Sequence, residues 1–349
     1  MEESSPSLQE WKDLFTAAME FQETRCWGWM DDSDVFGIQN PENGEIGYCC
    51  VLGGLGHFFG LVVYLGTEGL NTHQGIQSGE IPAEDFEATC LQRCLVASFE
   101  ARKFIEEPDR EILRKLNLTF TGPNGWPKFR SHRPGYSPWY LEKPEVTFLT
   151  LALQQAREVT LRLTHTKELL KPPAKNRYFV RVPEQKGAVL SWRDDWLKPH
   201  QERKTELIVP MVDELRLQRI KKKTHPGNGI WEADFFYVPV VVNEKGRPFY
   251  PLTFLWVDHA TGLVLQNHLA SPENYVSEFQ SQIFRLLEQV DPLPQAVLVS
   301  REETFKLLDP FASRLGVELR RVKTLSELER AKKSLFDFAF SPKGKARKR

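Results

Sequence analysis

The chain has 349 residues, of which 27% are charged and 41% hydrophobic, and its formal net charge at pH 7 is −1. A chain of this length can form two domains that each bury a core, and its composition is that of an ordinary globular protein. The near-zero charge argues against a general affinity for nucleic acid, and no apolar run approaches the ~20 residues that span a bilayer. The polar, acidic N-terminal segment does not have the pattern of a signal peptide, so we expect a cytoplasmic protein.

For the N-terminal half we expect an α+β domain over residues 1–170. Its predicted elements, in chain order, are a helix over 8–23, strands over 35–39, 45–52 and 58–65, a segment over 84–105 whose apolar stretch from Cys94 to Phe99 fits helix or strand, and helices over 109–116 and 144–170. Apolar side chains recur at helical spacing in the first and last of these helices. The glycine-rich link Gly53-Gly54-Leu55-Gly56 lacks both nucleotide-binding glycine spacings, so we expect it only to turn the chain.

All cysteines lie in this N-terminal domain, in apolar surroundings: Cys26, Cys49, Cys50, Cys90 and Cys94. No CxxC pair or matching histidine pair is present, so structural zinc is the less favoured interpretation. We predict buried free thiols in a reducing compartment. Cys90 and Cys94 are expected to share one face of a helix, because they are four residues apart.

The segment over residues 126–140 mixes aromatic and basic side chains and contains three prolines, so we expect no regular helix there. Lys128, Arg130, Arg133 and Trp139 are our candidate contacts to a nucleic acid or another partner, because cations between aromatic rings can bind single strands. The alternative is an irregular structural loop whose rings complete the core while the cations reach solvent. The overall charge of the chain favours this structural alternative.

A partly ordered connector is expected over residues 171–229, after the break at Lys171-Pro172-Pro173. Its predicted elements are strands over 177–182 and 205–209 and a helix over 212–223. The helix ends in three lysines, which suit the negative end of a helix dipole.

The second domain is expected over residues 230–340. Its predicted elements are strands over 230–242, 249–257 and 263–269, a helix over 272–290, a strand over 295–299, a helix over 302–315, a strand over 317–322 and a helix over 326–338. Three antiparallel strands followed by alternating strands and helices predict a mixed sheet with helices on its faces, an α/β domain.

Acidic residues on the first two of these strands are the candidate metal ligands and catalytic residues. Glu232 and Asp234 alternate along one strand and share a face, and Asp258 ends the next strand. Carboxylates gathered in this way can hold Mg²⁺ or Mn²⁺ for phosphoryl chemistry. The alternative, which we favour, is that Asp258 opens a turn before Gly262 and that Asp234 is a satisfied structural residue.

The last segment, residues 341–349, is basic and carries five cations without an acid. It lies beyond the last apolar periodicity, so we expect a disordered tail without a role in stability. Lys343, Lys345 and Arg347 are candidate contacts to phosphates, should the partner be a nucleic acid.

Motifs in both halves resemble a family of uncharacterised two-domain bacterial proteins. They are Trp27-x-Trp29-Met30, Gly44-Glu45-Ile46-Gly47-Tyr48, Phe129-Arg130-Ser131, the run from Trp231 to Asp234, Arg247-Pro248-x-Tyr250-Pro251 and Val257-Asp258-x-x-Thr261-Gly262. The family has no established activity. The resemblance therefore implies a bacterial cytoplasmic protein built from two domains of unknown function.

The C-terminal domain is also similar in topology to the integrase branch of the ribonuclease H-like fold, with Asp234 at the position of the first-strand acid. Catalytic members carry a further acid on the fourth strand, where this chain has Ser300. The resemblance thus implies a degenerate ribonuclease H-like domain. We predict a non-catalytic binding module without a cofactor, whose partner is nucleic acid or protein. The alternatives are a nuclease or phosphotransferase that uses Mg²⁺ or Mn²⁺, and a protein-interaction scaffold that uses the aromatic segment.

Overall fold

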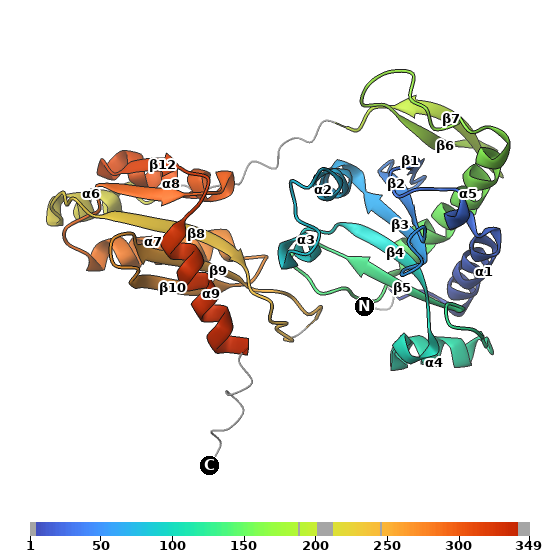
Figure 1. Ribbon diagram of the computed structural model, residues 1–349, viewed down its shortest axis with the longest axis horizontal. Coiled ribbons are helices and arrows are strands. Elements are labelled where there is room, and N and C mark those ends of the chain that lie inside the picture. The colour runs from blue at the N-terminus through green and yellow to red at the C-terminus, as the bar shows by residue number, and fades with distance from the viewer. Residues whose placement is uncertain (1–4, 188, 201–211, 245, 341–349) are drawn as a thin grey trace, which may run out of the picture. The chain divides into compact units, whose positions relative to one another are not determined.

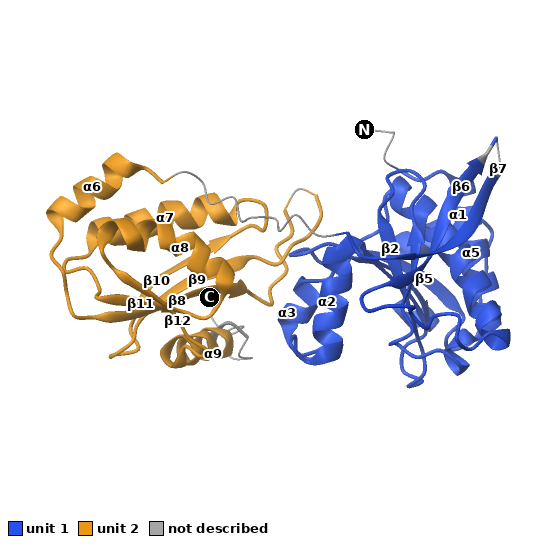
Figure 2. Ribbon diagram, turned by 90° about the horizontal axis from the view of Figure 1, so that it is seen from above, with its two compact units in different colours: residues 1–202 blue, residues 203–349 orange. Residues whose placement is uncertain are grey.

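The structure is a computed structural model that describes residues 5–187, 189–200, 212–244 and 246–340. The chain divides into two compact units, unit 1 over residues 1–202 and unit 2 over residues 203–349 (Figure 2). Each unit combines one mixed sheet with helices, so the predicted α/β class is confirmed.

Unit 1 is built on a seven-stranded sheet with the strand order β5-β4-β3-β2-β1-β6-β7 (Figure 1). Its main elements are α1 (Leu8–Thr24), β1 (Phe36–Gln39), β2 (Ile46–Leu52), β3 (Gly60–Leu65), α2 (Gly66–Ser78), α3 (Phe86–Cys90), β4 (Cys94–Glu100), α4 (Glu107–Lys115), β5 (Trp126–His132), α5 (Lys143–His165), β6 (Tyr178–Lys186) and β7 (Val189–Leu197). Neighbouring strands are antiparallel, except that β1 and β6 run parallel.

The sheet of unit 1 separates two cores, because successive side chains of a strand point to opposite faces. Along β2, Cys49 and Val51 join the larger core, which α1 and α5 complete. Tyr48 and Cys50 join a smaller core on the other face, together with Leu70 of α2. All five cysteines are buried and free, which confirms the prediction of buried thiols.

The prediction that one helix carries both Cys90 and Cys94 is wrong. Cys90 ends α3, and Cys94 begins β4, which pairs with β3. Strand pairing therefore overrides the four-residue spacing. The apolar stretch from Cys94 to Phe99, for which helix and strand were both open, is strand β4.

Helix α2 was not predicted from the sequence, because its glycines and polar residues have weak helix propensity. The glycines serve close packing instead. A Cβ atom at Gly69 would lie only 2.5 Å from the carbonyl oxygen of Arg93, so α2 can approach the sheet only with glycine at this position. The preference for helix is thus set by tertiary contacts, which a local sequence pattern does not reveal.

The expected domain boundary at residue 170 falls inside unit 1. Strands β6 and β7 form a hairpin that extends the first sheet from β1. Phe179 of this hairpin joins the larger core, and Arg181 is buried with hydrogen bonds to Gln155, Glu158 and Asp194. The strand that we expected over 205–209 lies outside the described residues.

The aromatic and basic segment is also more regular than expected, since Trp126–His132 forms β5 at the edge of the sheet. Pro127 is compatible with this place, because an edge strand leaves one row of N–H groups without a ladder partner. The glycine-rich link behaves as expected. Gly56 donates its backbone N–H to the carbonyl of Gly53 and has a φ of 74°, which favours glycine.

Unit 2 is built on a five-stranded sheet with the order β10-β9-β8-β11-β12. Its elements are α6 (Glu214–Lys223), β8 (Ile230–Tyr237), β9 (Leu252–Asp258), β10 (Val264–Ala270), α7 (Tyr275–Gln289), β11 (Ala296–Val299), α8 (Glu302–Leu315), β12 (Glu318–Arg321) and α9 (Ser326–Phe340). Strands β8, β9 and β10 are antiparallel, whereas β11 runs parallel to both β8 and β12. The predicted order of elements is confirmed.

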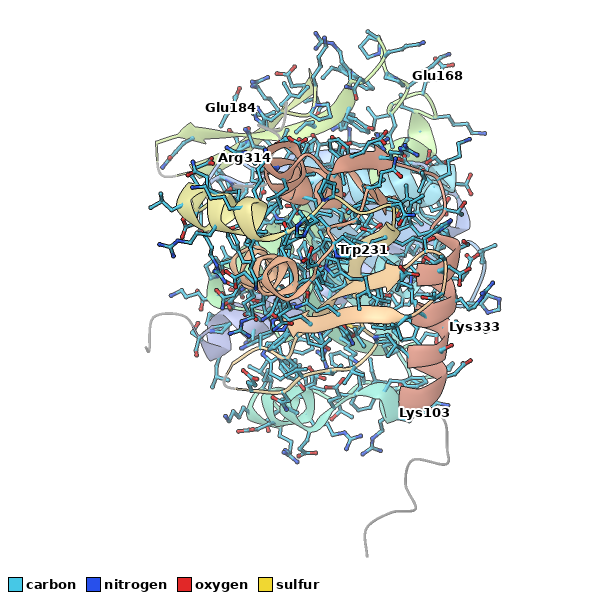
Figure 3. All side chains as sticks on the ribbon, turned by 90° about the vertical axis from the view of Figure 1, so that its left-hand side faces the viewer. Lys103, Glu168, Glu184, Trp231, Arg314 and Lys333 are labelled. Atoms are coloured by element: carbon cyan, nitrogen blue, oxygen red, sulfur yellow. The ribbon has the colours of Figure 1, made fainter. Side chains whose placement is uncertain are left out.

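Helices α7 and α8 cover one face of this sheet, and α9 covers the other. Along β8, Trp231, Ala233 and Phe235 face α7 and α8, and Phe236 faces α9. Helix α6 belongs to unit 2 rather than to a connector. Arg314 of α8, labelled in Figure 3, forms an ion pair with Glu214 of α6, and Leu217 and Ile220 of α6 join the core of the unit.

Candidate functional site

Asp234, the main candidate for metal binding, is a buried carboxylate in the centre of the second sheet and is 3% exposed. Its Oδ1 accepts hydrogen bonds from the backbone N–H of Phe235, at 3.2 Å, and from the hydroxyl of Thr304. Its Oδ2 accepts hydrogen bonds from the backbone N–H of Ser300, at 3.1 Å, and from the hydroxyl of Ser300. Both oxygens therefore hold the end of β11 and the first turn of α8 to β8.

Glu232, two residues earlier on β8, is 1% exposed and has the same kind of structural role. Its Oε2 accepts a hydrogen bond from the backbone N–H of Leu328 at 2.8 Å, in the first turn of α9. Its Oε1 lies 2.6 Å from Nδ1 of His259. Each acid of β8 thus meets the N-terminal turn of a helix, where negative charge is stabilised by the unpaired N–H groups and the helix dipole.

Asp258 is placed away from this pair. It lies opposite Trp231 in the register of β8 and β9, whereas Glu232 lies opposite Val257. Side chains that face each other across an antiparallel pair share a face of the sheet, so Asp258 is on the face opposite to Glu232 and Asp234. The three candidate ligands do not come together.

The side chain of Asp258 closes a turn instead. Its Oδ1 accepts hydrogen bonds from the hydroxyl of Thr261 at 2.7 Å and from the backbone N–H of Thr261 at 2.9 Å. These bonds lower the pKa of Asp258 below its ordinary value, the hydroxyl contributing most. Among the described residues, no group of three histidine, cysteine or acidic side chains is arranged to hold a metal ion.

The basic residues of the 126–140 segment are paired within unit 1. Arg130, 8% exposed, forms two hydrogen bonds with Asp109, at 2.9 and 2.8 Å, and its guanidinium lies 4.5 Å from the ring centre of Tyr140. Burial alone would lower the pKa of Arg130, but the hydrogen bonds and charges of Asp109 and Glu106 raise it above its ordinary value. Lys128 lies 3.1 Å from Glu106.

Arg133 and Trp139 complete this segment. Arg133 forms ion pairs with Glu142 and Glu145, at 3.1 and 3.0 Å, at the beginning of α5. Trp139 is half-exposed, and its backbone pairs with Ser131 of β5. The segment therefore anchors α4 and α5 to the edge of the sheet. Lys343, Lys345 and Arg347, the candidate contacts of the tail, lie outside the described residues.

A polar cleft in unit 1 was not anticipated from the sequence. It has a volume of about 210 Å³ and opens beside α2, between the segment before β1 and the start of β6. Its polar lining side chains are Ser33, Asp34, His73, Gln74, Gln77, Arg177 and Tyr178.

His73 is the most unusual residue of this cleft, because it is 5% exposed and its Nε2 atom is buried without a hydrogen-bond partner. Its ring centre lies 4.6 Å from that of Tyr64. Burial lowers the pKa of His73, although the charge of Asp32 opposes this effect. The sequence contains no signal for the site, since His73 lies on an unpredicted helix and its neighbours come from distant segments.

Around His73, the hydrogen bonds bring three segments together. Gln74 donates its amide to the hydroxyl of Tyr178, and the ring of Tyr178 packs edge-on against Tyr48. Gln77 donates from Nε2 to the carbonyl of Asp32 at 2.9 Å. The side chains of α2 thereby fix the segment before β1 and the first residue of β6.

A second, wider groove of unit 1 has a volume of about 670 Å³. It lies between the end of α1 and the loop over residues 119–125, with Trp27, Phe59 and Phe120 among its lining residues. Gln22 donates to the carbonyl of Asn124 at 2.6 Å and holds the loop to α1. The aromatic rings suit an apolar contact, and the charged lining residues are Glu23 and Arg25.

Comparisons with known proteins match each unit separately. Residues 11–181 match a family described as a domain of unknown function (DUF7309), and residues 216–336 match another domain of unknown function (DUF6930). No curated protein matches the chain. Among the helices of the described residues, none combines the length and apolar character needed to cross a bilayer. The two matches together cover most of the chain, which is therefore a two-domain protein whose first part is similar to DUF7309 and whose second part is similar to DUF6930.

Proposed function

We propose that the protein is a non-catalytic binding module, and that unit 2 is a degenerate ribonuclease H-like domain. The observation that carries this proposal is the set of hydrogen bonds on Asp234, whose two oxygens accept from Phe235, Ser300 and Thr304. Ser300, where a catalytic relative would carry an acid, donates to Asp234 and brings no second carboxylate that could hold a cation together with it. The residue at the first-strand position thus stabilises the sheet.

The strand order supports the ribonuclease H-like part of the proposal. Three antiparallel strands are followed by two parallel ones, with β8 in the centre and β11 beside it. The alternative, a metal-dependent nuclease or phosphotransferase, needs Glu232, Asp234 and Asp258 to face one cation. The register of β8 and β9 puts Asp258 on the other face of the sheet, which argues against a cation shared by these three acids.

Nucleic acid is the partner that we propose to test first, with protein as the alternative. The cations at Lys128, Arg130 and Arg133 are paired with acids of their own unit and have little charge left for phosphates. Most contacts to the phosphates of a nucleic acid would therefore come from the basic residues after 340. We also propose a bacterial cytoplasmic location, which suits free cysteines in a reducing compartment.

Nuclease activity tests the non-catalytic part of the proposal. Full-length protein incubated with Mn²⁺ or Mg²⁺ is expected to leave single- and double-stranded DNA and RNA intact. Asp234→Asn is expected to change any residual cleavage by less than a few-fold. A loss of about a hundredfold in a folded variant, which corresponds to about 2.7 kcal/mol of transition-state stabilisation, would contradict the proposal.

Binding to labelled oligonucleotides, followed by fluorescence anisotropy over a salt series, tests the partner. If the five cations of the tail contact phosphates, log K should fall with log salt with a slope of roughly −3.5 to −4.5. Deleting residues 343–349 should flatten this slope and leave the melting temperature unchanged. Absence of binding at low salt would exclude the nucleic-acid partner and make a protein-interaction scaffold the leading function.

A further inference from the structure

Three buried side-chain atoms of the described residues lack a hydrogen-bond partner: His73 Nε2, Trp256 Nε1 and Gln266 Oε1. Trp256 lines an apolar cavity of about 20 Å³, too poor in polar groups for a specific ligand, and Gln266 still donates from Nε2 to Gln282 at 3.1 Å. His73 differs from both because it lines the polar cleft beside α2. A buried polar atom without a partner is destabilising, so a cleft that retains one is a candidate for a ligand.

The same cleft contains two opposite charges that form no ion pair in the described structure. Asp34 lines it and uses Oδ2 to accept a hydrogen bond from the backbone N–H of Asp31 at 2.9 Å. Arg177 lines it and donates from one guanidinium nitrogen to the carbonyl of Trp196 at 2.6 Å. One carboxylate oxygen and several guanidinium N–H groups thus remain for a ligand.

Neutral side chains of the cleft also have hydrogen-bond donors or acceptors that are still available. The hydroxyl of Tyr178 accepts from Gln74, so its own proton is free to be donated. Gln77 uses its amide nitrogen on the carbonyl of Asp32, which leaves its Oε1 as an acceptor. The neutral imidazole of His73 can accept or donate at Nε2, according to its tautomer.

We propose that this cleft binds a small zwitterion of the amino-acid class. The ammonium group would meet Asp34, the carboxylate would meet Arg177 and the hydroxyl of Tyr178, and a polar group of the ligand would satisfy His73. Opposite charges in one cleft suit a ligand with both charges better than a simple anion or cation, since each would leave one protein charge unmatched.

The size of the cleft supports the same class. Its volume of about 210 Å³ is below the roughly 300–1,000 Å³ of sites for drug-sized ligands, but it is sufficient for a single amino acid. Val35, Leu70 and Leu170 are apolar lining residues that can contact an aliphatic side chain. The site lies entirely in unit 1 and is independent of the role proposed for unit 2.

Isothermal titration of the full-length protein with each protein amino acid, up to millimolar concentrations, tests the proposal. At least one is expected to bind, and Asp34→Asn and Arg177→Gln are each expected to raise its Kd by tenfold or more. The matched controls Asp13→Asn and Arg157→Gln, on α1 and α5, should leave the Kd unchanged. Absence of binding by every amino acid, or binding that the cleft variants leave unchanged, would overturn the proposal.

Two further measurements separate a zwitterion site from weaker alternatives. The N-acetylated and the methyl-esterified forms of the bound amino acid should each lose most of the affinity, because each lacks one charge. Equal binding of either form would overturn the assignment. His73→Phe retains an aromatic ring beside Tyr64 and should raise the Kd without lowering the melting temperature. A lower melting temperature with an unchanged Kd would show that His73 is structural.

Discussion

Asp234 in unit 2 and His73 in unit 1 are both buried polar side chains, with exposures of 3% and 5%, but their surroundings differ. Asp234 accepts hydrogen bonds at both oxygens, and the bonds from Ser300 and Thr304 hold the end of β11 and the first turn of α8 to β8. His73 has a buried nitrogen with no partner, in a cleft that also contains Asp34 and Arg177. The burial of Asp234 is explained by its hydrogen bonds within the fold, whereas no hydrogen bond explains the burial of His73 Nε2.

This difference shows why an acid in a suggestive sequence position is a weaker sign of function than a buried group without partners. A folded chain satisfies almost all of its buried polar atoms, and an unsatisfied one costs about 1–3 kcal/mol. Glu232 follows the pattern of Asp234, since both its oxygens are occupied. If this comparison is right, substitution of a buried side chain that has partners should destabilise the fold, and substitution of His73 should not.

The largest effect is expected at Arg130, a partnered cation of unit 1. Arg130→Met leaves Asp109, whose side chain is 12% exposed, without its cation, and leaves Glu106 with Lys128 alone. Removing one partner of a buried ion pair destabilises by about 3–5 kcal/mol, so we expect a loss in that range in urea denaturation. A decrease in the free energy of unfolding below ~1 kcal/mol would mean that the charge of Arg130 does not stabilise the fold and is available to a partner molecule.

Arg133→Met is the matched control for this experiment. The side chain of Arg133 is 43% exposed, as against 10% for Arg130, and it pairs with the exposed Glu142 and with Glu145. Exposed ion pairs contribute about 0–1 kcal/mol, so this variant should lose little stability.

Asp234→Asn is expected to destabilise by about 2 kcal/mol, because hydrogen bonds to a charged group are each worth ~1.5–3 kcal/mol and the amide can retain only part of them. The amide nitrogen cannot accept from the backbone N–H of Ser300. Hydrogen exchange measured by mass spectrometry should become faster in β8, β11 and the first turn of α8. A variant as stable as the parent would show that Asp234 is not held by these donors and would reopen the catalytic alternative.

His73→Phe tests the other side of the comparison. The variant removes the unpartnered nitrogen and keeps a ring against Tyr64, so the free energy of unfolding should rise by about 1 kcal/mol. Chemical denaturation in the absence of ligand gives this value. Destabilisation by a similar amount would mean that the imidazole has a favourable interaction within the fold, and the contrast with Asp234 would then disappear. Tyr64→Phe, which keeps the ring beside His73, is a control for packing.

The sequence predicts unit 2 well because its pattern is local. Strands alternate with helices, and the helix over 302–315 is found at its expected bounds as α8. The candidate acid at Asp234 was found for the same reason, since it interrupts an apolar strand. The face on which Asp258 lies depends on the register of β8 and β9, which a single sequence does not give.

Unit 1 is less predictable because distant segments determine its structure. Helix α2 forms although its glycines have low helix propensity, and β6 joins β1 across more than a hundred residues of sequence. The cleft at His73 combines three such segments. Its residues could be proposed only after α2 and β6 were placed, because none of them belongs to a recognisable motif.

The smallest effect concerns Glu106, the exposed end of the ion-pair network of Arg130. Burial would raise the pKa of Glu106, but hydrogen bonds from Tyr140 and Lys128 and the charge of Arg130 together lower it to about 2, from an ordinary value of 4.5. A carboxyl group whose pKa is lower in the folded state stabilises the fold above its ordinary pKa. This contribution is therefore complete above pH 4.5 and is lost as the pH falls towards 2.

Glu106→Gln should remove this pH dependence while retaining an oxygen for the hydrogen bond that caps α4. Because the side chain of Glu106 is 52% exposed, solvent screens its interactions, and the difference between parent and variant above pH 4.5 should stay below about 1 kcal/mol. Unfolding free energies of the two proteins, measured across this range, should converge as the pH falls. Parallel curves would show that Glu106 has the same pKa in the folded and unfolded states, and that the partners of Arg130 reduce to Asp109 alone.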